Sequence, residues 1–197
     1  KIITFNKNIF VGYNRLFFNS LKKINKTYIN KFYCNVVISY TIFDEVKMNI
    51  SHLLSILLYL FGDLKILRKI KNGNNINIIL RDKKKNLIFF NILNTSTDSY
   101  SINIISKKIN YVFKPLEILN IYNSIKRNYF SGNKKKLYVT QLLIKKFNEF
   151  ESNNFKPGFL NQMINFKNFC YKKNKKIFNN INFANKVINL SHKILKR

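Results

Sequence analysis

The sequence predicts an α+β fold in which helices pack on an antiparallel sheet. Three observations predict it. Apolar residues make up 46% of the 197 residues, segments of helical and strand periodicity alternate along the first half, and an Asn-Gly turn joins two apolar runs. We expect two small lobes: an N-terminal α-β-α-β-β-β lobe at 1–94 and a mainly β C-terminal lobe at 95–150. A basic extension rich in Phe, Asn and Lys follows at 151–197.

The elements of the first lobe follow from the spacing of apolar residues. Residues 13–30 carry apolar side chains three and four apart, which predicts a helix. The aromatic and β-branched run at 31–40 predicts a strand. A second helix is expected from Asp44, as its N-cap, to Phe61, with Gly62 as the C-cap. Further strands are expected at 64–70, 76–80 and 87–93, with a hairpin turn at 71–74.

The second lobe is shorter and less regular. A strand is expected at 100–106. Pro115 can occupy the first position of a short helix that runs to about residue 126. Residues 137–144 are compatible with a strand or with the start of a helix. In the basic extension, the sequence predicts a short helix at 185–196.

The chain is strongly basic. It carries 36 Lys+Arg against 8 Asp+Glu, which gives a formal net charge of +28 at pH 7. So much charge repels itself unless a polyanion neutralises it, and nucleic acid offers the densest array of phosphates. Lysine greatly outnumbers arginine, which favours contacts with the phosphate backbone over reading of base edges. An anionic membrane surface is the weaker alternative.

Few side chains are suited to catalysis. Eight carboxylates and two histidines leave little for acid–base or metal chemistry. The sequence contains no GxxxxGKS/T, GxGxxG, GxSxG or HExxH motif. His52 and His192 belong to no constellation and are interpreted as ordinary side chains. Cys34 and Cys170 lie far apart, which predicts no disulfide and a reducing compartment. We therefore expect a non-catalytic protein with no cofactor and no metal site.

Five basic clusters indicate nucleic-acid binding, because lysines interleaved with asparagine and aromatic residues suit contacts with phosphates and 2′-hydroxyls. They lie on the first predicted helix, in the turn after the 76–80 strand, after the 100–106 strand, in a lysine triplet and in the extension. The predicted RNA-binding residues of these clusters are Lys22, Lys23, Lys26, Arg81, Lys83, Lys84, Lys85, Lys107, Lys108, Lys134, Lys135, Lys136, Lys172, Lys173, Lys175 and Lys176.

Neither a membrane span nor a signal peptide is predicted. The most apolar segment, 50–61, is interrupted by Ser and His, and a span needs about 20 apolar residues. The composition also bears on origin, since Asn, Ile, Lys, Phe and Tyr are abundant while Trp is absent. Such a bias follows A/T-rich codons and is typical of an organellar, parasite or endosymbiont genome.

The order of predicted elements over about 13–115 resembles the family of small-subunit ribosomal protein eight. Leu21-Lys22-Lys23-Ile24-Asn25-Lys26 resembles the pattern of its first helix, and 51–64 resembles its second helix, which closes with Gly. Residues 76–103 are similar to its strand pair, serine loop and Tyr-bearing strand, with Ser96 at the loop serine. The Ser-Thr-Ser-x-Gly turn of the family is reduced here to Tyr138-Val139-Thr140-Gln141.

The resemblance implies two α/β-containing lobes that bind the central domain of small-subunit ribosomal RNA, with RNA contacts at Ser96, Thr140 and Gln141. We therefore predict a structural constituent of the small ribosomal subunit of an organelle, in the first place a mitochondrion. Its expected partners are ribosomal RNA and neighbouring ribosomal proteins, with no homo-oligomer. The alternatives are another organellar ribosomal protein of either subunit, a degenerate RNA-processing nuclease and a peripheral membrane protein.

Overall fold

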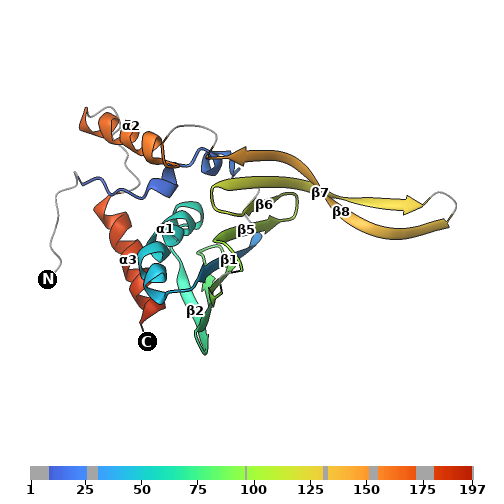
Figure 1. Ribbon diagram of the computed structural model, residues 1–197, viewed down its shortest axis with the longest axis horizontal. Coiled ribbons are helices and arrows are strands. Elements are labelled where there is room, and N and C mark those ends of the chain that lie inside the picture. Colours follow the sequence, from blue (N-terminus) through green and yellow to red (C-terminus); the bar gives the residue numbers. More distant parts are fainter. Residues whose placement is uncertain are drawn as a thin grey trace.

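The computed structural model shows a mixed α+β fold built on one eight-stranded sheet (Figure 1). It describes residues 9–25, 31–95, 97–130, 133–150, 155–171 and 180–196, and at 48, 124–130 and 133–141 it describes the backbone alone. The strands are β1 Phe32–Tyr40, β2 Lys65–Asn72, β3 Asn75–Arg81, β4 Leu87–Asn94, β5 Ser101–Ser106, β6 Asn110–Phe113, β7 Ile118–Phe130 and β8 Asn133–Asn148. The helices are two short 3-10 helices, η1 Asn14–Phe17 and η2 Ser20–Lys23, and three α-helices, α1 Phe43–Phe61, α2 Phe159–Cys170 and α3 Ile181–Leu195.

The strand order is β2-β3-β4-β1-β5-β6-β7-β8. Among the described strands β1 and β4 form the one parallel pair, and every other neighbouring pair is antiparallel. The predicted α+β class with an antiparallel sheet is confirmed at this level. Because β5 pairs with β1, the sheet continues across residue 94.

The main core lies between the sheet and the two helices α1 and α3, which pack against one face (Figure 1). Strands β3 and β4 alternate buried and half-exposed residues, as expected where one face of a sheet is covered. The fully enclosed side chains include Ile50, Leu53 and Leu54 on α1 and Val187 on α3. Each such side chain stabilises the fold by about 1.5–3 kcal/mol relative to an exposed one.

Several predicted elements of the first lobe are confirmed. The 31–40 strand is β1, and the second helix is α1, which Gly62 ends with a φ of 76° while its N–H donates to the Leu58 carbonyl. The Asn-Gly hairpin joins β2 to β3, with a φ of 56° at Gly73. One detail is wrong: Ile42 occupies the N-cap position, and Asp44 lies in the first turn, paired with Lys47 at 2.6 Å.

The predicted helix at 13–30 is not found in its described part, which holds η1 and η2 instead. The backbone is extended at Phe18, which lies between η1 and η2. Leu16, Phe17 and Phe18 are consecutive and all buried. Three adjacent side chains cannot share one stripe of a surface helix, so this segment folds as short turns enclosed on several sides.

The predicted helix after Pro115 is also wrong, since this segment forms β7. Leu119 and Ile121 are buried and flank the half-exposed Asn120, which is the period of a strand. Strands β7 and β8 continue beyond the body of the molecule as a long hairpin (Figure 1). The sequence also missed β6 and α2, which are short or weakly patterned.

The region after residue 150 contributes to the folded body. Helix α3 begins at Ile181, a few residues before the predicted helix at 185–196, and the Asn180 side chain caps it by accepting a hydrogen bond from the Phe183 N–H. Its apolar stripe packs on α1. None of the helices within the described residues combines the length and the hydropathy that a membrane crossing requires.

Candidate functional site

A small polar cavity lies where four segments, distant in the sequence, meet. Its volume is about 90 Å³. This is room for several water molecules, yet it is well below the roughly 300 Å³ of even a small ligand pocket. The lining of the cavity consists of Asn14, Arg15 and Phe18 from the η1 region, Asn49 and His52 from α1, Glu117 from the β6–β7 turn, and Lys156 and Pro157 from the loop before α2.

Helix α1 supplies the floor of the cavity. Asn49 and His52 are three residues apart and therefore lie on one face of the helix, while Ile50 and Leu53 face the core and are fully buried. The His52 ring is edge-on to Tyr13, with 5.9 Å between the ring centroids. This packing fixes the imidazole at the cavity wall.

The loop before α2 is pressed against η1. Gly158 has a φ of 81°, and a Cβ atom at this position would clash with the carbonyl oxygen of Asn14. The Asn14 side-chain amide in turn donates to the Pro157 carbonyl at 3.2 Å. Only glycine allows so close an approach. The contact places Lys156, whose side chain is exposed, at the mouth of the cavity.

Burial and two nearby cations determine the state of His52. Burial of the imidazole, with the positive charges of Arg15 and Lys156, lowers its pKa from 6.5 to about 4. His52 is therefore neutral at physiological pH. Its Nδ1 atom is buried and has no hydrogen-bond partner in the described part of the chain. An unpaired buried polar atom costs free energy.

Arg15 has the same feature. Its Nη1 atom is buried and unpaired. In the described part of the chain, ion pairs join Lys47 to Asp44, Lys114 to Asp98, and both Lys83 and Lys186 to Asp63. Glu117 is within ion-pair distance of neither Arg15 nor Lys156. The cavity is thus lined by the Arg15 and His52 side chains, and neither takes part in an ion pair with Glu117.

A neighbouring polar group holds Asn49 in place. Its side-chain amide donates to the Glu45 carbonyl at 3.0 Å. Burial raises the pKa of Tyr100, which keeps the hydroxyl of this residue protonated. The wall beside His52 is therefore ordered before any ligand enters.

Sequence reasoning missed this cavity. It interprets His52 as an ordinary side chain and names neither Arg15 nor Lys156 as functional. The one local signal is a histidine inside the most apolar segment, 50–61. The other signals depend on contacts between η1, α1 and the loop before α2, and such contacts are not visible in one sequence.

The predicted RNA-binding residues that the structure describes belong to several different elements, and none of them lines the cavity. They are Lys22 and Lys23 on η2, Arg81, Lys83, Lys84 and Lys85 at the β3–β4 turn, and Lys107 and Lys108 at the β5–β6 turn. Lys83 pairs with Asp63 at 3.0 Å. Of Lys134, Lys135, Lys136, Thr140 and Gln141 the structure gives the backbone, on β8. Lys26, Ser96, Lys172, Lys173, Lys175 and Lys176 lie outside the described residues.

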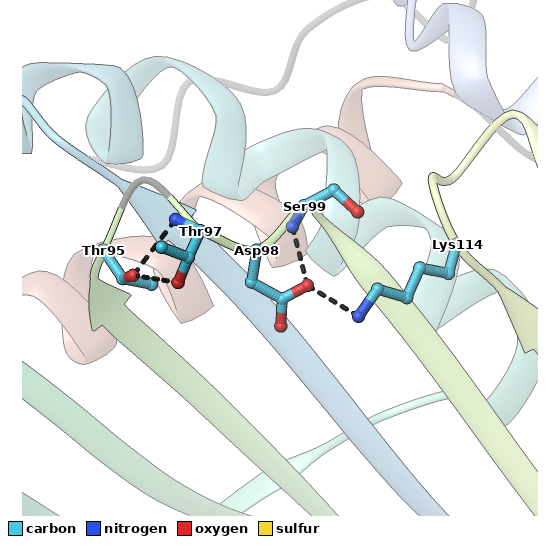
Figure 2. Close-up of polar contacts among 5 residues, drawn as sticks. All are labelled: Thr95, Thr97, Asp98, Ser99 and Lys114. Atoms are coloured by element: carbon cyan, nitrogen blue, oxygen red, sulfur yellow. Dashed lines mark hydrogen bonds and ion pairs between the residues drawn. The ribbon is translucent and has the colours of Figure 1, made fainter.

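Residues beside the predicted serine loop bind one another (Figure 2). The Thr95 and Thr97 hydroxyls are 2.8 Å apart. The Asp98 carboxylate pairs with Lys114 at 2.7 Å and accepts from the Ser99 N–H at 2.7 Å, and these contacts, led by Lys114, lower the Asp98 pKa. This cluster explains the local loop structure. No group of three possible metal ligands occurs among the described residues.

The fold is similar to that of several solved oxidoreductases. The chain is similar to the dehydrogenase MviM from Clostridium difficile, with a TM-score of 0.65 and 21% identity over 94% of this chain and 60% of that one. It is also similar to a levoglucosan dehydrogenase solved in complex with NADH and levoglucosan (TM-score 0.61, 11% identity, 96% and 64% covered). A third is the UDP-N-acetylglucosamine 3-dehydrogenase GnnA from Acidithiobacillus ferrooxidans (0.58, 9%, 93% and 59%).

The chain thus spans about three fifths of the length of these neighbours. No protein-family model matches the sequence, and no curated protein matches it. At these identities the likeness establishes the fold.

This likeness overturns the ribosomal prediction. The assignment to the ribosomal protein eight family, the rRNA and ribosomal-protein partners and the non-enzymatic role are wrong, because the fold is that of dehydrogenases. The order of elements led to the wrong family because it does not specify which strands pair with one another. Strand β1 lies between β4 and β5 in the middle of the sheet, an arrangement that a list of strands and helices cannot show.

The residues present do not fit a nicotinamide dinucleotide. Such cofactors bind at the edge of a doubly wound parallel sheet, where a glycine-rich loop opens a helix. Here the described sheet has one parallel pair, and the sequence has no GxGxxG motif. What the described residues offer instead is the small polar cavity.

Proposed function

We propose that this chain forms the substrate-binding part of an oxidoreductase that acts on an alcohol group of a sugar-like compound. The observation that carries the proposal is the cavity itself, where a neutral His52 faces the same small space as Arg15. Two of the structural neighbours are named for sugar-derived compounds, levoglucosan and UDP-N-acetylglucosamine, and this supports the substrate class.

The residues of the cavity account for the proton in such a reaction. Oxidation of a secondary alcohol removes a proton from oxygen and a hydride from carbon. A neutral imidazole can accept the hydroxyl proton, and the neutral His52 side chain lines the cavity. Asn49, fixed by Glu45, lines the same wall and holds the space open for the hydroxyl. The hydride passes to a nicotinamide dinucleotide, which we place outside the described residues.

The finer division of the fold remains a prediction. Two lobes that meet at 94 and a basic extension from 151 are inferred from composition and periodicity. Limited proteolysis would test it, since first cleavages near 94 and 150 would support the division and a chain cut elsewhere would not. A mitochondrial location likewise remains a prediction from composition.

The function is tested with the protein expressed from its natural gene. Reduction of NAD is measured with a panel of pyranoses, sugar acids and sugar phosphates. We expect turnover with at least one compound. His52→Gln should lower kcat at least about 100-fold while KM changes little, because the loss of a general base acts on the chemical step.

The control is His192→Gln, which replaces the other histidine, an exposed residue of α3. This variant should leave kcat unchanged. Absence of turnover with every compound, or full kcat in His52→Gln, would contradict the proposed function.

A further inference from the structure

Two cavity residues, Arg15 and Lys156, have no part in the proton transfer proposed above. Arg15 presents a buried Nη1 atom without a partner. Lys156 lies at the mouth, its Nζ atom 5.9 Å from the centroid of the Phe159 ring. Both charges act on His52. Two cations around one small cavity need a chemical explanation.

We propose that the ligand of this cavity carries an anionic oxygen group, a carboxylate or a phosphate, which Arg15 and Lys156 bind while an adjacent hydroxyl of the same ligand meets His52. The role of the hydroxyl rests on the proposed function. The anionic group rests on the charges and unpaired atoms of the cavity alone.

The balance of charge favours an anion. Arg15 and Lys156 contribute two positive charges and Glu117 one negative charge to the lining, while His52 is neutral. One positive charge therefore remains uncompensated. Since no ion pair in the described residues joins Glu117 to either cation, the donors of Arg15 stay available to a ligand.

Geometry favours the same group. The guanidinium presents its donors in a planar fork that matches a carboxylate or a phosphate. A buried Arg Nη1 left unpaired is costly, and an anionic oxygen is its strongest partner. At about 90 Å³ the cavity is large enough for such a group and a neighbouring hydroxyl. The remainder of a sugar would extend through the mouth past Lys156.

An anion would also improve His52 as a proton acceptor. Burial, together with the charges of Arg15 and Lys156, lowers the pKa of His52 to about 4, far below the neutral range in which a general base works best. An anionic group between the cations and the imidazole favours the protonated form and raises this pKa. Binding of the correct substrate would thereby activate the base.

The test compares three probes that share a pyranose ring. D-glucose is neutral, D-glucuronate carries a carboxylate and D-glucose 6-phosphate carries a phosphate. Affinity is measured by calorimetry at low ionic strength, and the His52 ring signals are followed by NMR against pH. We expect one or both anionic probes to bind at least about 10-fold more tightly than glucose and to raise the His52 pKa. The anionic probe that binds more tightly shows whether the anionic group of the ligand is a carboxylate or a phosphate.

The variants are Arg15→Gln and Lys156→Gln, with Lys107→Gln as a control that removes the same charge from the β5–β6 turn, outside the cavity lining. Arg15→Gln should weaken the binding of the anionic probe about 10- to 100-fold and should hardly change the binding of glucose. Lys156 is exposed, so its variant remains informative even if Arg15→Gln fails to fold. Equal binding of all three probes, or an anion preference that survives in both variants, would overturn the inference.

These outcomes separate the inference from the proposed function. Sugar oxidation that does not distinguish charged from neutral substrates would retain the oxidoreductase and reject the anionic ligand. Anion binding that depends on Arg15, without any sugar-dependent turnover, would retain the binding site and reject the oxidoreductase.

Discussion

The cavity wall and the lysine-bearing turns, at residues 81–86 and 106–110, use positive charge in opposite ways. At the cavity, Arg15 and His52 are partly enclosed, and each keeps a buried polar atom unpaired. In the turns, lysines extend into solvent, and the Lys83 side chain is 79% exposed. Water screens such charges and little depends on them. A few enclosed groups therefore say more about function than the total charge does.

The largest expected difference concerns two glycines with positive φ, Gly158 beside the cavity and Gly73 in the open β2–β3 turn. Gly158→Ala should lower the free energy of unfolding by about 3 kcal/mol, because it combines a strained φ with a clash against backbone. Gly73→Ala has free space around the new Cβ and should cost only about 1 kcal/mol. Urea unfolding measures both. Equal losses would show that the loop before α2 does not depend on this close approach.

The next effect is the pH dependence of stability due to His52. Between pH 6.5 and about 4 the unfolded chain binds a proton at this position that the folded chain does not. Stability should therefore fall as pH is lowered through this window, by about 2 kcal/mol for a partly exposed imidazole. His52→Gln should flatten the decline, whereas His192→Gln should keep it. Denaturant midpoints between pH 7 and 4 measure this, and identical profiles would refute the assigned state of His52.

A smaller effect is expected at Asp63, which pairs with Lys186 at 2.6 Å and Lys83 at 3.0 Å. Hydrogen bonds from these lysines lower the Asp63 pKa, so its contribution is present above pH 3.8 and is lost as pH falls below it. The groups are largely exposed, and Asp63→Asn should cost less than about 1 kcal/mol. The cost should shrink further in 1 M salt. A cost that salt leaves unchanged would mean that the pairs are less exposed than described.

The smallest effect is expected at the β5–β6 turn. Lys107→Gln combined with Lys108→Gln removes two exposed charges and should change stability by less than about 0.5 kcal/mol. Thermal unfolding measures it. A loss above 1 kcal/mol would break the contrast between turn and cavity.

The predicted parts of the fold are those with a local signal. α1 has a long apolar stripe, and the β2–β3 hairpin has an Asn-Gly turn, so sequence alone located both. The helix predicted at 13–30 was wrong in its described part, 13–25, because the apolar residues there are buried from several directions. The helix predicted after Pro115 was wrong because the alternation of Leu119, Asn120 and Ile121, which indicates a strand, was given less weight than the proline. The first error concerns neighbours that one sequence cannot show, and the second concerns a strand period that the sequence does contain.

The site was harder to predict than the fold. Arg15, His52 and Lys156 come from separate segments, and nothing in their local sequence links them. The lysine clusters, by contrast, were conspicuous in the sequence and belong to several different elements of the structure. Function was misread because the abundance of charge was visible and its placement was not.

The central position of β1 has a consequence for how the chain is made. Its partners on either side, β4 and β5, end at residues 94 and 106, so during synthesis β1 is complete more than 50 residues before the first of its neighbours. Long-range pairing of this kind slows folding. An apolar strand left uncovered for so long is the part of this molecule most in need of protection by a chaperone.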